Sequence, residues 1–181
     1  MKKVIERISV FVVASAFLLG VLIVGNTDMN KNVLTSTTIN GIDIESLDNK
    51  KIGWGIKRND NNEQPDVGTV NRKILDKYQG IYMGNKEQKL IYLTFDLGYE
   101  AGYTSKILEV LKKNDVKATF FITAHYLNTQ PDLVKQMIDE GHIVGNHTVN
   151  HKSMPSCSLD TIKKEVMDLH SAIYEKFGYE M

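Results

Sequence analysis

The chain has 181 residues, of which 42% are hydrophobic and 24% charged, and its formal net charge at pH 7 is zero. This length suits one ordinary domain and is too short for two full ones, and the composition predicts a packed core rather than wholesale disorder. The sequence has no basic stripe with interleaved aromatic residues, so nucleic acid is not an expected partner. The only cysteine is Cys157, which rules out an internal disulfide.

Residues 1–25 are predicted to be a secretory signal or a membrane anchor. Three basic side chains precede an uncharged stretch, Ile8–Val24, whose length is near the lower limit of about 17–25 residues for a membrane-spanning helix. The small residues Ala14–Ala16 could form a cleavage site but lie inside this stretch, so an uncleaved anchor is favoured over a cleaved signal. The preceding positive charges predict that the rest of the chain lies outside the cytoplasm, either anchored or secreted.

Two segments without strong periodicity follow. Residues 26–50 are rich in Asn, Thr, Ser and Asp, which is typical of a linker. Residues 51–88 form a lead-in segment, in which the apolar residues between Ile74 and Tyr78 predict one face of a short helix. Trp54, which lies between two glycines, has two interpretations, a packing residue and a platform for a sugar ring, and the first is favoured.

From residue 89 onward, strand and helix patterns alternate. Short apolar runs rich in β-branched and aromatic residues predict strands at Lys89–Phe95, Lys117–Thr123 and His142–Val144. Helices are predicted after them, with N-caps at Thr104, Thr129 and Ser158 and with ends near Lys113, Gly141 and Gly178. The alternation predicts an α/β fold with a parallel sheet covered by helices and about three βα units.

Side chains suited to metal chemistry fall at the carboxyl ends of the predicted strands, where the active sites of parallel α/β folds gather. Asp96 directly follows the first strand, where a partly desolvated carboxylate could take a proton from a metal-bound water. The alternative is an aspartate that caps the following turn. His147 and His151 lie on a loop after the third strand, and their spacing is that of two imidazole ligands of one divalent metal ion.

The other histidines have less specific positions. His142 coincides with the third strand and is interpreted as a structural or surface group. His125 follows the second strand without an evident partner, and His170 lies in the middle of a helix, where it is predicted to face solvent. Cys157 is interpreted as a small packing residue rather than as a nucleophile.

From residue 89 onward the chain closely resembles the polysaccharide deacetylase family, carbohydrate esterase family four. Thr94-Phe95-Asp96 matches the first motif of that family, and His147-Thr148-Val149-Asn150-His151 matches the second, His-Ser/Thr-x-x-His. The chain is also similar to the subgroup that deacetylates muramic acid so that a δ-lactam can form in spore cortex peptidoglycan. This narrower likeness is carried by Trp54-Gly55, Arg58-Asn59, Gln64-Pro65, Lys77-Tyr78, Gly98-Tyr99-Glu100 and Gly102-Tyr103-Thr104.

The resemblance implies a distorted (β/α) barrel, with residues 89–181 forming the N-terminal part of the deacetylase domain. It also implies that Asp96 is the general base, and that His147 and His151 bind a divalent metal, with zinc the expected ion. The implied reaction is hydrolysis of N-acetyl groups on cell-wall polysaccharide, with the N-acetylmuramic acid of peptidoglycan as the expected substrate.

Two departures from the family pattern affect these expectations. Leu97 stands where the family has a second aspartate as third metal ligand, so Glu100 or water would have to complete the coordination. The later family motifs, which include the general acid, do not follow Gly178. The resemblance therefore predicts an incomplete barrel whose third strand has an open edge, with impaired activity. The alternative function is a non-catalytic remnant that binds glycan or metal.

Overall fold

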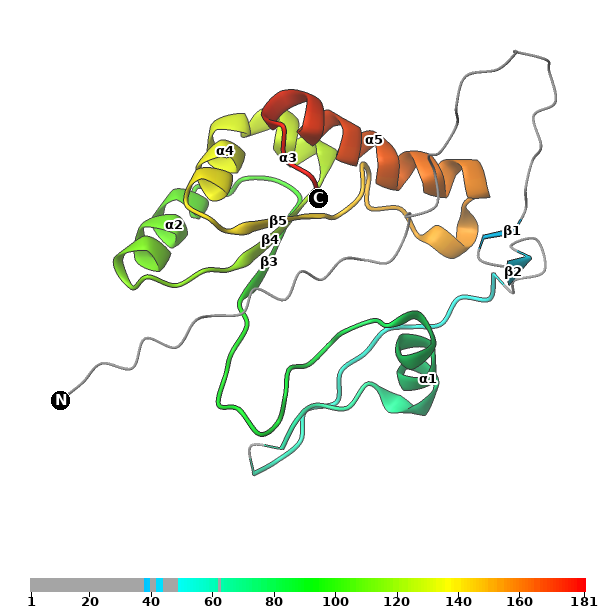
Figure 1. The fold of residues 1–181 in the computed structure, drawn as a ribbon. Coiled ribbons are helices and arrows are strands. Elements are labelled where there is room, and N and C mark those ends of the chain that lie inside the picture. The colour runs from blue at the N-terminus through cyan, green and yellow to red at the C-terminus, as the bar shows by residue number, and fades with distance from the viewer. Residues whose placement is uncertain (1–37, 40–41, 44–48, 62) are drawn as a thin grey trace, which may run out of the picture. The chain divides into compact units, whose positions relative to one another are not determined.

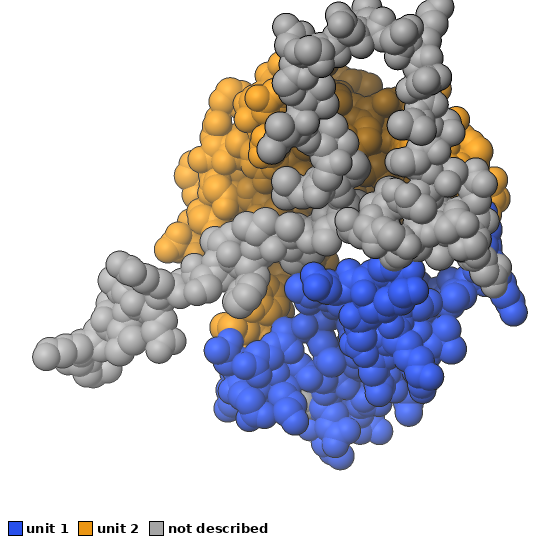
Figure 2. All heavy atoms as spheres, turned by 45° about the vertical axis from the view of Figure 1, so that its right-hand side comes forward, with its two compact units in different colours: residues 1–89 blue, residues 90–181 orange. Residues whose placement is uncertain are grey.

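The computed structural model describes residues 38–39, 42–43, 49–61 and 63–181. The predicted signal or anchor at 1–25 and most of the predicted linker at 26–50 lie outside the described residues. Within the described part, no helix combines the length and apolar character needed to cross a membrane. The chain divides into two compact units, residues 1–89 and 90–181, which Figure 2 colours separately.

The described residues of the first unit include two short strands and one helix. Strands β1 (Thr38–Ile39) and β2 (Ile42–Asp43) form an antiparallel pair, and helix α1 spans Gly68–Tyr78. This helix includes the short apolar face predicted from the sequence. Trp54 lies edge-on to Tyr82, with ring centroids 6.3 Å apart, yet 56% of it remains exposed. The Trp54 ring therefore has a packing contact without being buried.

The second unit is built on a three-stranded parallel sheet. Its strands are β3 (Thr94–Leu97), β4 (Thr119–Ile122) and β5 (Ile143–Asn146), in the order β3-β4-β5. The register pairs Asp96 with Phe121, and Phe121 in turn with Gly145. The α/β fold class and the parallel sheet predicted from the alternating pattern are confirmed.

Helices follow each strand and lie on one side of the sheet (Figure 1). They are α2 (Thr104–Lys113), α3 (Ala124–Thr129), α4 (Pro131–Asp139) and α5 (Leu159–Phe177), with a 3₁₀ turn, η2, at Met154–Ser156. The second unit therefore contains three βα units, as predicted. The helix predicted between Thr129 and Gly141 is α4, whereas the short helix α3 before it was not predicted.

The core lies between the sheet and these helices. Alternate strand residues point into it, so that Phe120, Ile122 and Val144 are buried while Phe121 is only half-buried on the opposite face. The ring of Phe120 stacks on Phe95, with centroids 5.0 Å apart. This alternation leaves Asp96, which is exposed, on the face of the sheet that the helices do not cover.

The first strand is shorter and starts later than predicted. Residues Leu90, Ile91 and Tyr92 were expected within it, but they are 59%, 88% and 63% exposed and lie before β3. Their apolar character predicts a strand, but β4 begins only opposite Thr94, so the ladder gives these residues no partner. Asp96 consequently lies within β3 and not beyond its end.

Two of the three predicted helix caps differ from the structure. Ser158 does cap α5, since its Oγ accepts a hydrogen bond from the Thr161 N–H at 3.3 Å. At α2, however, the N-terminal N–H groups bond to Glu100, and Thr104 is the first residue inside the helix. Thr129 ends α3, and its hydroxyl donates to the His125 carbonyl oxygen.

Strand β5 has β4 as its neighbour on one side and forms an edge of the described sheet. This matches the open edge expected for the third strand. One of its outward backbone groups is nevertheless satisfied, because the Val144 N–H donates to the Tyr179 hydroxyl oxygen at 3.0 Å. The segment after α5 thus returns to the sheet edge.

Candidate metal centre

The two predicted metal ligands lie together at the carboxyl end of β5. His147 directly follows this strand, and its N–H continues the ladder by donating to the Ile122 carbonyl oxygen at 3.0 Å. The rings of His147 and His151 are adjacent, with centroids 4.5 Å apart and planes inclined at 48°. The chain between them is a loop rather than a helix, as predicted.

The loop has a left-handed backbone at two residues that are not glycine. Thr148 has φ 67° and His151 has φ 54°, a region that most side chains avoid. Polar contacts within the loop support this conformation. The Thr148 N–H donates to Asn146 Oδ1 at 2.8 Å, and the His151 N–H donates to Thr148 Oγ1 at 3.0 Å. The threonine of the His-Thr-x-x-His motif therefore orients the second histidine.

Asp96 lies at the same end of the sheet as the histidine pair. Burial lowers the pKa of His147, the negative charge of Asp96 raises it, and the neighbouring His151 lowers it again, with a net decrease. The negative charge of Asp96 therefore partly opposes the lowering of the pKa of His147. Its own environment differs from the expectation, because Asp96 is exposed and not partly desolvated.

The candidate donor set consists of the two imidazole rings of His147 and His151. A lowered pKa keeps His147 neutral, which is the form that binds a metal ion. Among residues 49–61 and 63–181 and the short β1 and β2 strands, no three His, Cys, Asp or Glu side chains are grouped as a metal site would require. Leu97, at the position of the expected third ligand, packs against the hydrophobic core. The histidine pair therefore fits a metal ion only with other ligands, such as water or substrate, in the remaining positions.

Glu100 is engaged elsewhere and does not serve as the third ligand. One carboxylate oxygen accepts hydrogen bonds from the N–H groups of Gly102, Tyr103 and Thr104, and the other accepts from the Tyr126 hydroxyl at 2.7 Å. Burial alone would raise the pKa of Glu100, but these hydrogen bonds outweigh it and lower the pKa from 4.5 to about 2. Glu100 is thus an ionised cap on the start of α2.

Replacing Glu100 with Gln is expected to lower the free energy of unfolding by about 2 kcal/mol at pH 7, the typical contribution of hydrogen bonds to a charged acceptor. Because the folded-state pKa lies below the ordinary value, this stabilisation is present above about pH 5 and is lost as the pH falls toward 2. Urea unfolding at pH 7 and pH 3 measures the difference, with exposed Glu109→Gln on α2 as control. An equal loss at both pH values would contradict the assignment.

The remaining histidines lie apart from this centre. His142 is buried, and its Nδ1 accepts a hydrogen bond from the Ala118 N–H at 3.2 Å, so it is a structural group as expected. His125 is exposed on α3, whereas His170 is half-buried and not fully solvent-facing. The thiol of Cys157 donates to the Ser153 carbonyl oxygen at 3.5 Å.

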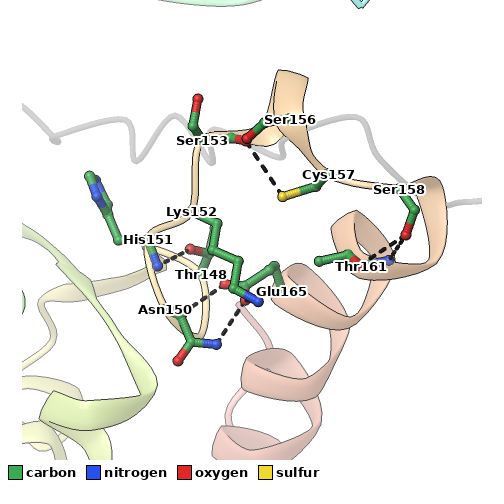
Figure 3. A network of polar contacts seen from close by, with 10 residues as sticks. All are labelled: Thr148, Asn150, His151, Lys152, Ser153, Ser156, Cys157, Ser158, Thr161 and Glu165. Carbon is green, nitrogen blue, oxygen red and sulfur yellow. Dashed lines mark hydrogen bonds and ion pairs between the residues drawn. The ribbon is translucent and has the colours of Figure 1, made fainter.

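Sequence reasoning missed one residue that contacts the loop. Glu165, in the middle of α5, is buried, and both of its carboxylate oxygens accept hydrogen bonds from Asn150 (Figure 3). A glutamate at such a position in an amphipathic helix has no distinguishing pattern. Only the packing of the loop onto α5 reveals its role.

Residues 83–181 match the polysaccharide deacetylase family, and the chain belongs to this family. The match includes the β3 segment with Asp96 and the loop with His147 and His151. The partial (β/α) barrel expected from the motifs is therefore confirmed at the level of fold and family.

Particular relatives extend the likeness into the lead-in segment. The chain is 45% identical over 134 residues to the peptidoglycan-N-acetylmuramic acid deacetylase PdaA of Bacillus subtilis, covering 74% of this chain and 51% of the relative. The structure of B. subtilis PdaA, described as a family 4 carbohydrate esterase, superposes with a TM-score of 0.72 at 44% identity, covering 75% of this chain and 58% of that one.

A second relative is an uncharacterized 30.6 kDa protein of Geobacillus stearothermophilus, which is 53% identical over 135 residues. That alignment covers 75% of this chain and 51% of the relative. The chain thus spans about half the length of the curated relatives it matches.

Proposed function

We propose that the chain contributes to metal-dependent hydrolysis of N-acetyl groups on peptidoglycan, with Asp96 as general base and His147 and His151 as metal ligands. The observation that carries this proposal is the pair of imidazole rings 4.5 Å apart, at the same end of the sheet as a carboxylate whose charge acts on one of them. Membership of the polysaccharide deacetylase family supports the reaction class.

Each side chain has a distinct task in this reaction. His147 and His151 would hold the metal ion, for which zinc is the expected choice, through their two adjacent imidazole rings. A divalent metal held there would supply polarisation of the acetamide carbonyl and would lower the pKa of a bound water. Asp96 accepts the proton of the attacking water as a new bond forms between its oxygen and the carbonyl carbon. Cleavage of the C–N bond then yields acetate and the free amine, which takes up a proton.

The proposed substrate is the N-acetylmuramic acid of peptidoglycan, in the context of spore cortex. The name of the B. subtilis relative supports this sugar, since it is a peptidoglycan-N-acetylmuramic acid deacetylase. A cell-wall substrate requires an enzyme outside the cytoplasm, which agrees with the signal or membrane anchor predicted for residues 1–25. The proposal also predicts that N-acetylglucosamine is the poorer substrate.

Acetate release tests the proposed reaction. The 181-residue chain is incubated with N-acetylated muropeptides, once with added zinc or cobalt and once after removal of metal by a chelator. We expect acetate only with metal present, and more of it from muramic acid residues than from glucosamine residues. Equal release with and without metal would contradict the metal-dependent mechanism.

A second candidate function is non-catalytic binding of glycan or metal. It is favoured by Leu97, which packs against the hydrophobic core where the family motif has a third metal ligand for catalysis. Zinc binding without acetate release under any condition would support this alternative and would contradict the catalytic proposal.

A further inference from the structure

The loop that carries the two histidines adopts a conformation that its own sequence does not favour. A left-handed backbone at a residue other than glycine costs roughly 1–3 kcal/mol, and Thr148 and His151 both have it. Such a conformation persists only where surrounding contacts fix it. The N–H groups of Thr148 and His151 are bonded by Asn146 and Thr148, which leaves those of Val149 and Asn150 to find acceptors elsewhere.

Helix α5 supplies both of the missing acceptors through a single residue. The Val149 N–H donates to the backbone carbonyl oxygen of Glu165 at 2.9 Å, and the Asn150 N–H donates to the Glu165 carboxylate at 2.7 Å. The side-chain amide of Asn150 donates to the other carboxylate oxygen at 2.8 Å. Lys152 approaches the same oxygen at 3.4 Å, so the carboxylate also anchors the end of the loop.

These contacts lie on the side of the loop opposite to the ring of His151. Figure 3 shows Asn150 and Lys152 turned toward Glu165, while the ring of His151 points away from α5. Glu165 is only 3% exposed, so its hydrogen bonds are shielded from competing water. A buried carboxylate is costly unless it is paired, and the loop provides that pairing. Loop and helix therefore stabilise each other.

We propose that Glu165 is a positioning residue, which holds the 147–151 loop in the conformation that brings His147 and His151 together as metal ligands. The inference rests on the proposed metal-binding role of the two histidines. Glu165 does not touch the metal or the substrate. Its effect passes through Asn150, which lies between the two ligands in the chain.

Two substitutions separate the hydrogen-bonding role of Glu165 from its volume. Glu165→Leu keeps a side chain of similar size and removes every acceptor, whereas Glu165→Gln keeps one oxygen that can accept from the Asn150 N–H. The matched controls are Glu175→Leu and Glu175→Gln, on the exposed side of the same helix. Zinc affinity of the 181-residue chain is measured by calorimetry, and amide hydrogen exchange of the metal-free chain is measured by NMR.

We expect Glu165→Leu to weaken zinc binding by about 10–100-fold, the range typical of losing a group that orients a ligand. Glu165→Gln should fall between Glu165→Leu and wild type, and the Glu175 variants should match wild type. In the metal-free chain, Glu165→Leu should lose exchange protection at the Asn150 amide while the Phe120 amide of β4 remains protected. This pattern of hydrogen exchange would show that the loop has changed and the sheet has not.

The outcomes distinguish this inference from the proposed function. Absence of zinc binding by the wild-type chain would overturn the metal-binding role itself. Zinc binding by wild type and by Glu165→Leu with equal affinity would overturn the positioning role alone. Unchanged protection of the Asn150 amide in Glu165→Leu would also overturn it. If Glu165→Leu loses exchange protection throughout the chain, the variant has unfolded and Glu165→Gln decides the test. Wild-type zinc affinity and wild-type protection of the Asn150 amide in Glu165→Gln would then contradict the proposal.

Discussion

Replacing Asp96 with Asn is expected to lower the rate of acetate release by about 10²–10⁴-fold, the contribution typical of a general base. Asparagine has nearly the same size and keeps hydrogen-bonding capacity, but it cannot accept the proton of the attacking water. Because Asp96 is exposed, the substitution creates no buried unpaired group, so the fold should be unaffected. The comparison is made at saturating zinc, so that any small change in metal affinity does not affect the measured rate.

A matched control for this substitution is Asp115→Asn. Asp115 is exposed in the turn after α2 with φ 53°, a conformation that asparagine tolerates as well as aspartate does. The Asp115→Asn variant should release acetate at the wild-type rate. An Asp96→Asn variant that releases acetate within twofold of the wild-type rate would exclude Asp96 as the base.

Replacing either His147 or His151 with Ala is expected to weaken zinc binding by at least about 100-fold, beyond the 10–100-fold typical of losing a supporting group. Each substitution leaves a single protein ligand where the structure brings two rings together. His151 is exposed, His147 is half-buried, and neither belongs to the hydrophobic core, so the core is preserved and each variant should fold. Zinc content after dialysis and calorimetric titration measure the loss.

His125→Ala provides the control for the histidine substitutions, since His125 is exposed on α3 and makes no part of the loop. It should bind zinc as wild type does. If His147→Ala and His151→Ala both retained the metal content of wild type, the ligand assignment would be wrong.

The sheet and its helices were predictable because their determinants are local. Apolar runs and helical periodicity in the sequence predict which segments become β4 (Thr119–Ile122), β5 (Ile143–Asn146) and α5 (Leu159–Phe177). The start of β3 was not predictable in this way. Its bounds depend on where the neighbouring strand begins, and the apolar residues from Leu90 to Tyr92 have no opposite strand.

The residues of the candidate site could be proposed from the sequence, but the contacts that support them could not. The spacing of His147 and His151 within one motif predicts them as a pair of ligands without any coordinates, and the structure brings their rings together. Glu165 and Glu100, by contrast, acquire their roles only by tertiary contact, since hydrogen bonds join Glu165 to Asn150 and Glu100 to Tyr126 across the fold. Sequence reasoning also predicted a partly desolvated Asp96, whereas the described sheet leaves this carboxylate exposed.

The most direct test of the central claim is an NMR titration of the imidazole nitrogens of the wild-type chain with zinc. The chain has five histidines, so every candidate ring can be followed at once. We predict that the ring nitrogens of His147 and His151 shift together and saturate at one zinc ion per chain, while those of the other three histidines do not. Saturable shifts at His125 or His170, or no shift at His147 and His151, would contradict the claim that His147 and His151 are the metal ligands.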